Sequence, residues 1–203
     1  MAGGLQMKEH ATPGARGNTV ERILATASAQ FAAFGYNGAS TRDIAAGAGV
    51  NEVTIYRHFP RKRNLYLAAL EAELSKISLR GDLLAGLAEA ADGRTALERG
   101  SALISLIIEE NTDLLRLLHY GSLELSDEID PLIRRHLGEP VKVLAFYLEP
   151  WIAKGELRAA SPQALVLALV ALVLMEKPLG RIFPGGSSMG ESSIKAGLEI
   201  CLP

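Results

Sequence analysis

Hydroxyl and cationic side chains gather between residues 41 and 63 at spacings that suit the binding of a polyanion. Thr41 and Arg42 stand at the start of one predicted short helix. The exposed side of the next predicted helix carries four polar residues: Thr54, Tyr56, Arg57 and His58. Hydroxyls, helix N-termini and cations bind phosphates, and the N-terminal residues of a helix in the major groove read base edges. These residues therefore predict docking on double-stranded DNA.

Three consecutive cations, Arg61, Lys62 and Arg63, follow in the predicted first turn of a fourth helix. Positive charge at this end of a helix opposes the helix dipole and costs some stability. Phosphate binding would offset that cost, because a helix N-terminus attracts phosphate and the cations add counterion release. A solvated charge cluster is the usual alternative, but beside the two short helices we favour a phosphate site.

Glu52 lies among these residues and carries a charge that would repel phosphate. It could accept a hydrogen bond from a cytosine amino group. The alternative is a favourable charge near a helix N-terminus, which we rank slightly higher.

Motifs that look catalytic or metal-binding lack the partners that their chemistry needs. The run Gly186–Gly190 has the letters of a hydrolase nucleophile elbow, but no histidine follows His136. Starting from Gly185 it also has phosphate-loop spacing, but Glu191 replaces the essential lysine. The single Cys201 allows no internal disulfide, and no metal spacing relates the four histidines, which are His10, His58, His119 and His136. We expect no catalytic residue, no metal, no cofactor and no enzymatic activity.

A predicted three-helix unit would hold the DNA-docking residues in place. Its first helix begins at Asn18, which forms a capping box with Glu21, and it ends at Gly35, as a left-handed C-cap requires. Ser40 and Asp43 form a second capping box that opens the next helix.

The second and third helices are predicted to form a helix-turn-helix. Gly49 ends the second helix, Asn51 caps the third over residues 52–58, and Pro60 separates it from a fourth helix over 61–79. Helices this short are unstable alone. We expect them to pack on the first helix through Phe31, Phe34, Ile44 and Ile55.

The remainder of the chain is also predicted to be helical, which makes the fold class all-α. Apolar residues recur every three or four positions and strand signals are almost missing. Pro131 and Pro162 each follow a capping residue and predict helix starts, whereas Pro140 and Pro150 predict a kink or a break. The later helices are expected over residues 82–91, 95–109, 112–125, 131–154, 162–183 and 192–202.

Charge is divided unevenly along a chain whose formal net charge is -2. Residues 1–80 hold ten Lys and Arg against six Asp and Glu, and residues 81–203 hold eleven against seventeen. Only the first part is therefore expected to meet a polyanion. The longest apolar run, 164–175, is shorter than the roughly 20 residues of a membrane span. We expect no export signal, no membrane association and a cytoplasmic location.

Residues 23–70 resemble the TetR family of bacterial regulators. The resemblance lies in Phe31 followed by Gly35-Tyr36, then Asp43-Ile44-Ala45, Ala48-Gly49-Val50, Tyr56-x-His58-Phe59, Lys62 and Leu65. It covers about a quarter of the chain. Arg61 and Arg63 depart from it, since the family commonly has a small capping residue and an acidic residue there.

The resemblance implies a role for each residue at the DNA-docking site. Thr41 and Arg42 would contact the backbone and a base edge. Residues that would enter the groove are Asn51, Val53 and Thr54. Residues that would hold phosphates are Tyr56, His58 and Lys62.

The predicted organisation is a flexible leader over 1–17, a DNA-binding domain over 18–64 and a helical domain over 65–203. The apolar surface of the last domain exceeds what a DNA anchor needs, so we expect both a ligand pocket and a partner surface. The resemblance implies a small-molecule pocket and a homodimer formed by the last two long helices. Together these features predict a repressor that binds a palindromic operator and is released by an unidentified ligand.

Apolar and aromatic residues at helical spacing are the candidate pocket lining, although such residues are more often plain core. Glu176 could orient a polar or cationic ligand, form an ion pair or reach solvent. The other candidates are Leu103, Ile107, Leu118, His119, Tyr120, Phe146, Tyr147, Trp151 and Met175. The competing interpretations are a helical enzyme or ligand carrier, and an adaptor that forms a heteromer.

Overall fold

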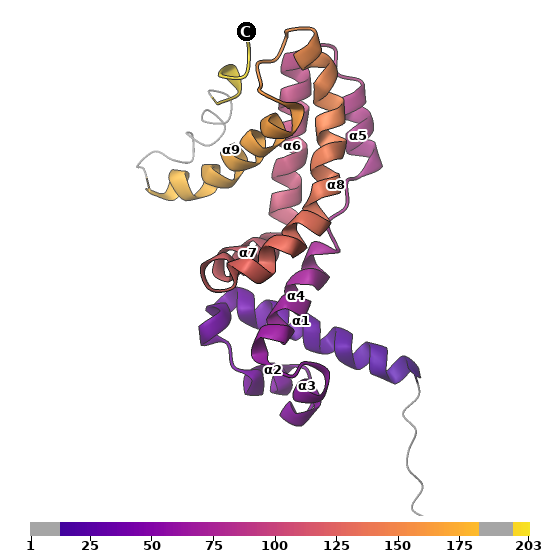
Figure 1. Cartoon of the computed structure of the whole chain (residues 1–203), viewed down its shortest axis with the longest axis vertical. Helices are drawn as coiled ribbons and strands as arrows, with labels where there is room; N and C mark the ends of the chain where they lie inside the picture. Colours follow the sequence, from indigo (N-terminus) through magenta and orange to yellow (C-terminus); the bar gives the residue numbers. More distant parts are fainter. Residues whose placement is uncertain (1–12, 183–196) are drawn as a thin grey trace, which may run out of the picture. The chain divides into compact units, whose positions relative to one another are not determined.

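The computed structural model describes residues 13–182 and 197–203, with side chains over 19–175 and 197–203. All regular elements within those ranges are helices (Figure 1), which confirms the all-α prediction. The predicted last helix, 192–202, and the motif at Gly185–Gly190 lie mostly or wholly outside the described residues. The helices are α1 (Pro13–Gly38), α2 (Thr41–Gly47), α3 (Glu52–His58), α4 (Lys62–Leu74), α5 (Gly81–Ala88), α6 (Gly93–Glu110), α7 (Thr112–Glu124), α8 (Ser126–Ala153) and α9 (Pro162–Ile182).

The chain divides into two compact units. The first contains the described residues up to Glu73 together with Arg116–Ser126, and the second contains Leu74–Leu115 with the described residues from Asp127 onward. A segment from the middle of the chain, the last part of α7, thus belongs to the N-terminal unit. The predicted domains over 18–64 and 65–203 rest on local signals, which carry no information about this association.

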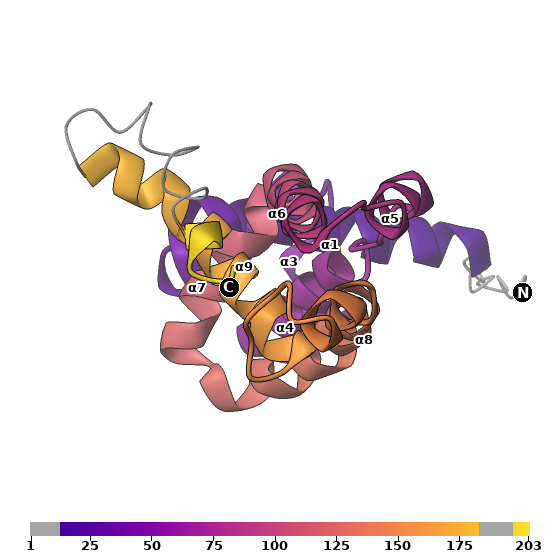
Figure 2. The same cartoon turned by 90° about the horizontal axis from the view of Figure 1, so that it is seen from above.

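Two short helices of the first unit begin at the predicted capping residues. The Ser40 side chain accepts a hydrogen bond from the Asp43 backbone N–H at 3.0 Å, and the Asn51 side chain accepts one from the Val53 N–H at 3.0 Å. Such caps satisfy backbone donors that have no partner inside the helix. Ile44 and Ile55 are buried and hold both helices in the unit, where α2 contacts α1 and α3 (Figure 1; Figure 2 shows α1 and α3 from above).

The first and fourth helices differ from the prediction at their ends. Helix α1 begins at Pro13 instead of Asn18, and proline suits the first position of a helix because its missing N–H needs no partner there. Gly35 interrupts α1 at φ 72° as predicted, but the helix resumes and ends at Gly38. Helix α4 is shorter than predicted and ends at Leu74. Phe34, expected in the core, is 61% exposed because it lies on the outer face just before the break.

Buried residues of α5, α6, α8 and α9 form the core of the second unit. Helix α6 contacts α5 on one side and α9 on the other, and α9 crosses it obliquely in Figure 1. The predicted start of α9 is confirmed, since Ser161 Oγ accepts from the Ala164 N–H at 3.1 Å just before Pro162. In the part of the chain that the structure describes, every helix is too short or too polar to span a bilayer.

Proline behaves differently from the prediction in α8. This helix begins at Ser126, so Pro131 lies inside it and does not start it. The helix continues through Pro140 and Pro150, so the predicted break is absent, and the alternative of a kink stays a prediction. Proline removes one helical hydrogen bond at each position. Burial along the helix compensates, because α8 packs through Ile129, Leu144, Ala145 and Leu148.

Ser28 of α1 gives the first testable prediction. Its side chain is 4% exposed, and Oγ has no hydrogen-bond partner among the described residues. A buried polar atom without a partner is destabilising, so Ser28→Ala should raise the free energy of unfolding by about 1 kcal/mol. Urea denaturation followed by circular dichroism measures this change.

Ser101 is the matched control for this substitution. It is also buried, but its Oγ donates to the Glu98 carbonyl at 2.9 Å. Ser101→Ala removes a satisfied hydroxyl and should leave stability unchanged or lower it slightly. If both variants lost the same free energy of unfolding, the Ser28 hydroxyl would not be destabilising.

Candidate nucleic-acid interface

The turn between α2 and α3 sets the angle of the docking surface. Gly49 adopts φ +64°, a left-handed conformation that glycine enters without strain. The Val50 N–H then donates to the Ala45 carbonyl at 3.0 Å, which closes the end of α2. Asn51 follows immediately as the cap of α3, so only three residues separate the C-cap Ala48 from Glu52.

Arg22 of α1 fixes this turn, a role that the sequence did not reveal. Its guanidinium donates to the Ala48 carbonyl through Nη2 at 2.7 Å and Nε at 3.2 Å, and to the Gly49 carbonyl at 3.4 Å. A cation at a helix C-terminus is favoured by the dipole and satisfies carbonyls that have no partner within the helix. No local signal links residues 26 positions apart, so sequence reasoning had no means of finding the contact.

The outer side of α3 exposes an apolar residue that its own fold does not need. Val53 is 73% exposed in the first turn, and Tyr56 is 45% exposed one turn later. Arg57 is also exposed, whereas Thr54 and His58 are half-buried. An apolar group at the start of a helix can contact a thymine methyl group in the major groove, and a neighbouring cation can contact phosphate.

The N-terminal ends of α2 and α3 face each other across the turn. Thr41 Oγ1 lies 2.5 Å from Glu52 Oε1 and 3.1 Å from the Tyr56 hydroxyl. The structure therefore brings two residues of the predicted site, Thr41 and Tyr56, into one hydrogen-bonded cluster with Glu52. Arg42 and Asn51, also predicted to contact DNA, are exposed beside it.

The three predicted phosphate-binding cations at the start of α4 are not equivalent. Arg61 precedes the helix, is exposed, and its carbonyl accepts from the Leu65 N–H at 3.2 Å. Lys62 Nζ lies 5.0 Å from the centre of the Tyr36 ring and donates to the Asn37 carbonyl at 3.4 Å. Burial lowers the pKa of Lys62, while the charge of Glu124 opposes this shift. Arg63 is half-buried.

Lys62 thus serves the fold of the unit in this structure, where it joins α4 to the end of α1. A contact between Lys62 and phosphate, as the sequence predicts, would require the ammonium to exchange the Asn37 carbonyl and the Tyr36 ring for DNA. No side-chain contact of Arg61 is described in the structure, so its guanidinium could bind phosphate without such an exchange.

Within the first unit, the last part of α7 packs against α4 and the end of α1. Tyr66 is fully buried in α4 and its hydroxyl donates to the Leu117 carbonyl at 2.5 Å. Burial, followed by the charge of Glu124, raises the pKa of the Tyr66 hydroxyl. Glu124 also accepts from the Asn37 side chain at 2.8 Å. Sequence reasoning missed these contacts because they join segments more than 50 residues apart.

The ten candidate pocket residues are divided between the two units. Leu118, His119 and Tyr120 belong to the first unit, whereas Leu103 is packed in the core of the second. The side chain of Glu176 lies outside the described residues. Within the second unit, Ile107, Tyr147 and Trp151 pack against the core, while Phe146 and Met175 are 69% and 51% exposed. The pocket itself stays a prediction.

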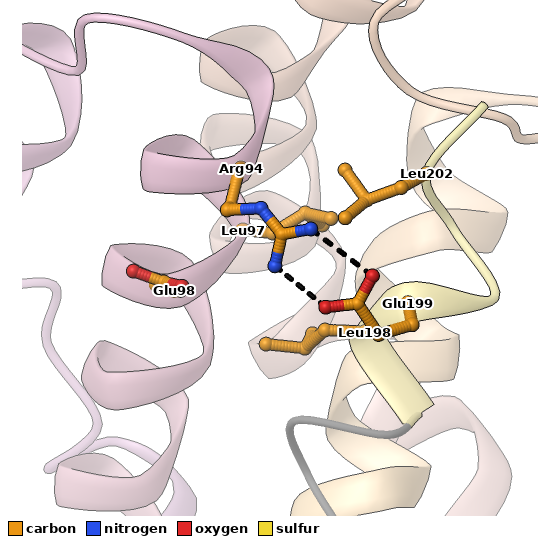
Figure 3. Close-up of a pocket in the computed structure, with 6 residues that line it drawn as sticks. All are labelled: Arg94, Leu97, Glu98, Leu198, Glu199 and Leu202. Carbon is orange, nitrogen blue, oxygen red and sulfur yellow. Dashed lines mark hydrogen bonds and ion pairs between the residues drawn. The ribbon is translucent and has the colours of Figure 1, made fainter.

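A small cleft of the second unit is lined by other residues. Its volume is about 70 Å³, far below the roughly 300 Å³ of the smallest common ligand pockets. Arg94 and Glu199 form a two-point ion pair at 2.6 and 3.0 Å across it (Figure 3). This pair lowers the pKa of the Glu199 carboxyl through hydrogen bonding to Arg94. We interpret the cleft as the seam where the C-terminal residues pack on α6.

Comparisons with known proteins agree with the geometry of the first unit. Residues 23–69 match the family described as bacterial regulatory proteins, tetR family. The chain is also similar to the nucleoid occlusion factor SlmA of Marinobacter nauticus, with 29% identity over 119 residues. That match covers 59% of this chain and 58% of the relative, so the chain spans little more than half of the relative's length.

Solved structures of regulators share the fold. HlyIIR, a hemolysin II transcriptional regulator, has a TM-score of 0.63 and 22% identity, covering 89% of this chain and 97% of that chain. A protein from Mesorhizobium loti, described as a TetR-family transcriptional regulator, has a TM-score of 0.61 and 20% identity, covering 95% and 100%. At these identities the likeness shows a common fold.

Proposed function

We propose that the chain is a member of the TetR family of bacterial regulatory proteins, whose model matches residues 23–69, and that it is a DNA-binding transcription regulator acting as a homodimeric repressor on a palindromic operator. Small-molecule ligand binding in the second unit would release it. The match of residues 23–69 to this family agrees with the prediction of a regulator and not an enzyme.

The exposed side of α3 is the single observation that supports DNA binding most strongly. Val53 is exposed at the start of the helix while Ile55 on the opposite side is buried. A seven-residue helix that is anchored by the buried Ile55, with Val53 and Arg57 exposed, suits the major groove. On a surface without a binding partner, the exposure of the apolar Val53 side chain to water would be unfavourable and would bring no compensating contact.

Exposed apolar residues on α9 support the proposal of a homodimer. Leu167 and Met175 are 57% and 51% exposed, and Leu174 is 36% exposed. One recognition helix offers few base contacts, and a symmetric pair on half-sites about 34 to 36 Å apart doubles them. Size-exclusion chromatography with light scattering tests this proposal, and a monomer at micromolar concentration would contradict it.

Ligand release requires a difference in affinity between two conformations. A ligand shifts a regulator off DNA only in proportion to its preference for the form that does not bind DNA. The chain passes from the first unit to the second within α4, returns to the first within α7 and enters the second again at the start of α8. These three helices connect the two units through the backbone, so a preference of the ligand for one conformation would reach α3 through them.

A fluorescence anisotropy titration tests DNA binding directly. Labelled duplex from the chain's own promoter region should be bound saturably, and the affinity should fall steeply as salt rises because counterions are released from phosphates. Excess unlabelled random-sequence duplex should compete weakly. Binding that does not saturate, or that is insensitive to salt, would contradict the proposed function.

A further inference from the structure

Two side chains of the predicted DNA-docking site, Thr41 and Tyr56, are hydrogen-bonded in one cluster with Glu52. Thr41 Oγ1 contacts both Glu52 Oε1 at 2.5 Å and the Tyr56 hydroxyl at 3.1 Å. Thr41 is the first residue of α2, and the other two lie in α3, so this cluster joins the two short helices. Thr41 and Glu52 are half-buried, and Tyr56 is exposed at the rim.

The protons of this cluster can be counted. Each hydroxyl carries one proton, and a carboxylate can only accept. Thr41 therefore donates to Glu52, and Tyr56 donates to Thr41. A phosphate oxygen also only accepts, so neither hydroxyl has a proton to offer to DNA while the cluster is intact.

We propose that Glu52 is a specificity-determining residue that restrains Thr41 and Tyr56 from binding DNA phosphates wherever base contacts do not offset the exchange. A phosphate oxygen is an ionised acceptor like Glu52, so Thr41 gains no stronger bond by the exchange, and the half-buried Glu52 carboxylate loses its charge-assisted donor on any duplex. On random sequence nothing compensates this cost. At an operator the base contacts of α3 do, and the ratio of specific to non-specific affinity rises.

The proposal rests on the proposed DNA binding, and Glu52→Gln tests it. Glutamine keeps the size of the side chain but offers Thr41 only a neutral acceptor. We expect the affinity for a random-sequence duplex to rise about tenfold and the affinity for promoter-region duplex to rise less. Fluorescence anisotropy measures both affinities.

Asp43→Asn is the matched control for charge. Asp43 is exposed in the first turn of α2, and this variant changes net charge as Glu52→Gln does. A gain that comes from charge alone shrinks as salt is raised, because exposed charges are screened. The gain from freed hydroxyl protons should persist in high salt for Glu52→Gln, and the Asp43→Asn gain should disappear. The proposal would be overturned if the gains in affinity of the two variants depended on salt in the same way.

A double-mutant cycle locates the effect at the hydroxyls. The cycle is measured in high salt, where the effect of charge alone is screened. In a Thr41→Val/Tyr56→Phe background the protons are missing, so adding Glu52→Gln should bring no further gain there. Glu52→Asp keeps the charge that stabilises the helix N-terminus but is shorter by one methylene, and it should raise random-sequence affinity severalfold. A gain that survives without the hydroxyls would overturn the proposal, as would an Asp variant that behaves like wild type.

Failure of the proposed function looks different from failure of this inference. A wild-type protein that binds neither duplex contradicts both. A wild-type protein that binds promoter-region duplex in a salt-sensitive manner, with unchanged selectivity in Glu52→Gln, overturns only the role of Glu52.

Discussion

Replacing Gly35 by alanine is expected to destabilise the protein by about 2–3 kcal/mol. Gly35 adopts φ 72° and ψ 176°, a backbone region that is open essentially to glycine alone. An added Cβ would also lie 3.3 Å from the Tyr120 ring. Urea denaturation followed by circular dichroism measures the loss in the free energy of unfolding.

The break at Gly35 has consequences beyond its own backbone. It turns the chain so that Tyr36 packs edge-on against Tyr66, with 5.4 Å between the ring centres, and the Asn37 side chain donates a hydrogen bond to Glu124. The alanine variant should therefore loosen the last part of α7 as well as α1, and hydrogen exchange should accelerate at Leu117 and its neighbours.

Gly138 provides the control for this substitution. It lies inside α8, and an added Cβ would meet nothing within 4 Å. Alanine there should be neutral or should stabilise the protein by about 0.5–1 kcal/mol, because glycine weakens a helix interior. If Gly35→Ala were as well tolerated as Gly138→Ala, the strain argument would be wrong.

Local signals predicted the helix-turn-helix well because its determinants are local. Ser40 and Asn51 cap α2 and α3 through residues two or three positions away. Gly49 has the left-handed conformation that its place in a tight turn demands. Each of these features can be read from a few neighbouring residue types.

Contacts between distant segments could not be read in this way. Arg22 looks like an ordinary exposed cation of a helix, yet it holds two carbonyls of the turn. Likewise, nothing near Leu117 in the sequence indicates that its carbonyl receives the Tyr66 hydroxyl. One sequence without tertiary structure carries no record of which surfaces meet.

Proline in α8 shows the opposite error, in which a local rule is overridden by packing. Pro131 follows Asp130 as a helix start would, but the chain is already helical from Ser126. The two acidic residues of the first turn, Asp127 and Glu128, favour the earlier start through the helix dipole. The prediction of a start at Pro131 gave the proline more weight than these two acidic residues.

The residues of the candidate site were predicted from type and spacing, but their present partners were not. Thr41 and Tyr56 have the hydroxyls expected of phosphate ligands, and the structure shows them bonded within the protein. Lys62 is similarly engaged with Tyr36. Composition indicates what a surface can bind, whereas the structure shows what must be given up when it binds.

Arg57 and Arg61 are the cations for which the largest effect on DNA binding is expected. Both are exposed, Arg57 in the last turn of α3 and Arg61 just before α4. Arg57→Gln/Arg61→Gln removes two phosphate contacts per protomer, so a dimer should lose four. The slope of log affinity against log salt should become shallower by about 3 to 4. The affinity at physiological salt should fall roughly a hundredfold or more.

Arg134→Gln/Arg158→Gln is the control because it removes the same charge from the second unit. Both arginines are exposed, and Arg134 lies 4.0 Å from Asp130 in a surface pair that contributes little to stability. This variant should leave the salt slope unchanged, since the second unit belongs to the acidic part of the chain. A shallower slope in the control would mean that net charge, and not contact with phosphate, governs binding. An unchanged slope in Arg57→Gln/Arg61→Gln would remove both arginines from the interface, and the search for phosphate ligands would then turn to Arg42 and Arg63.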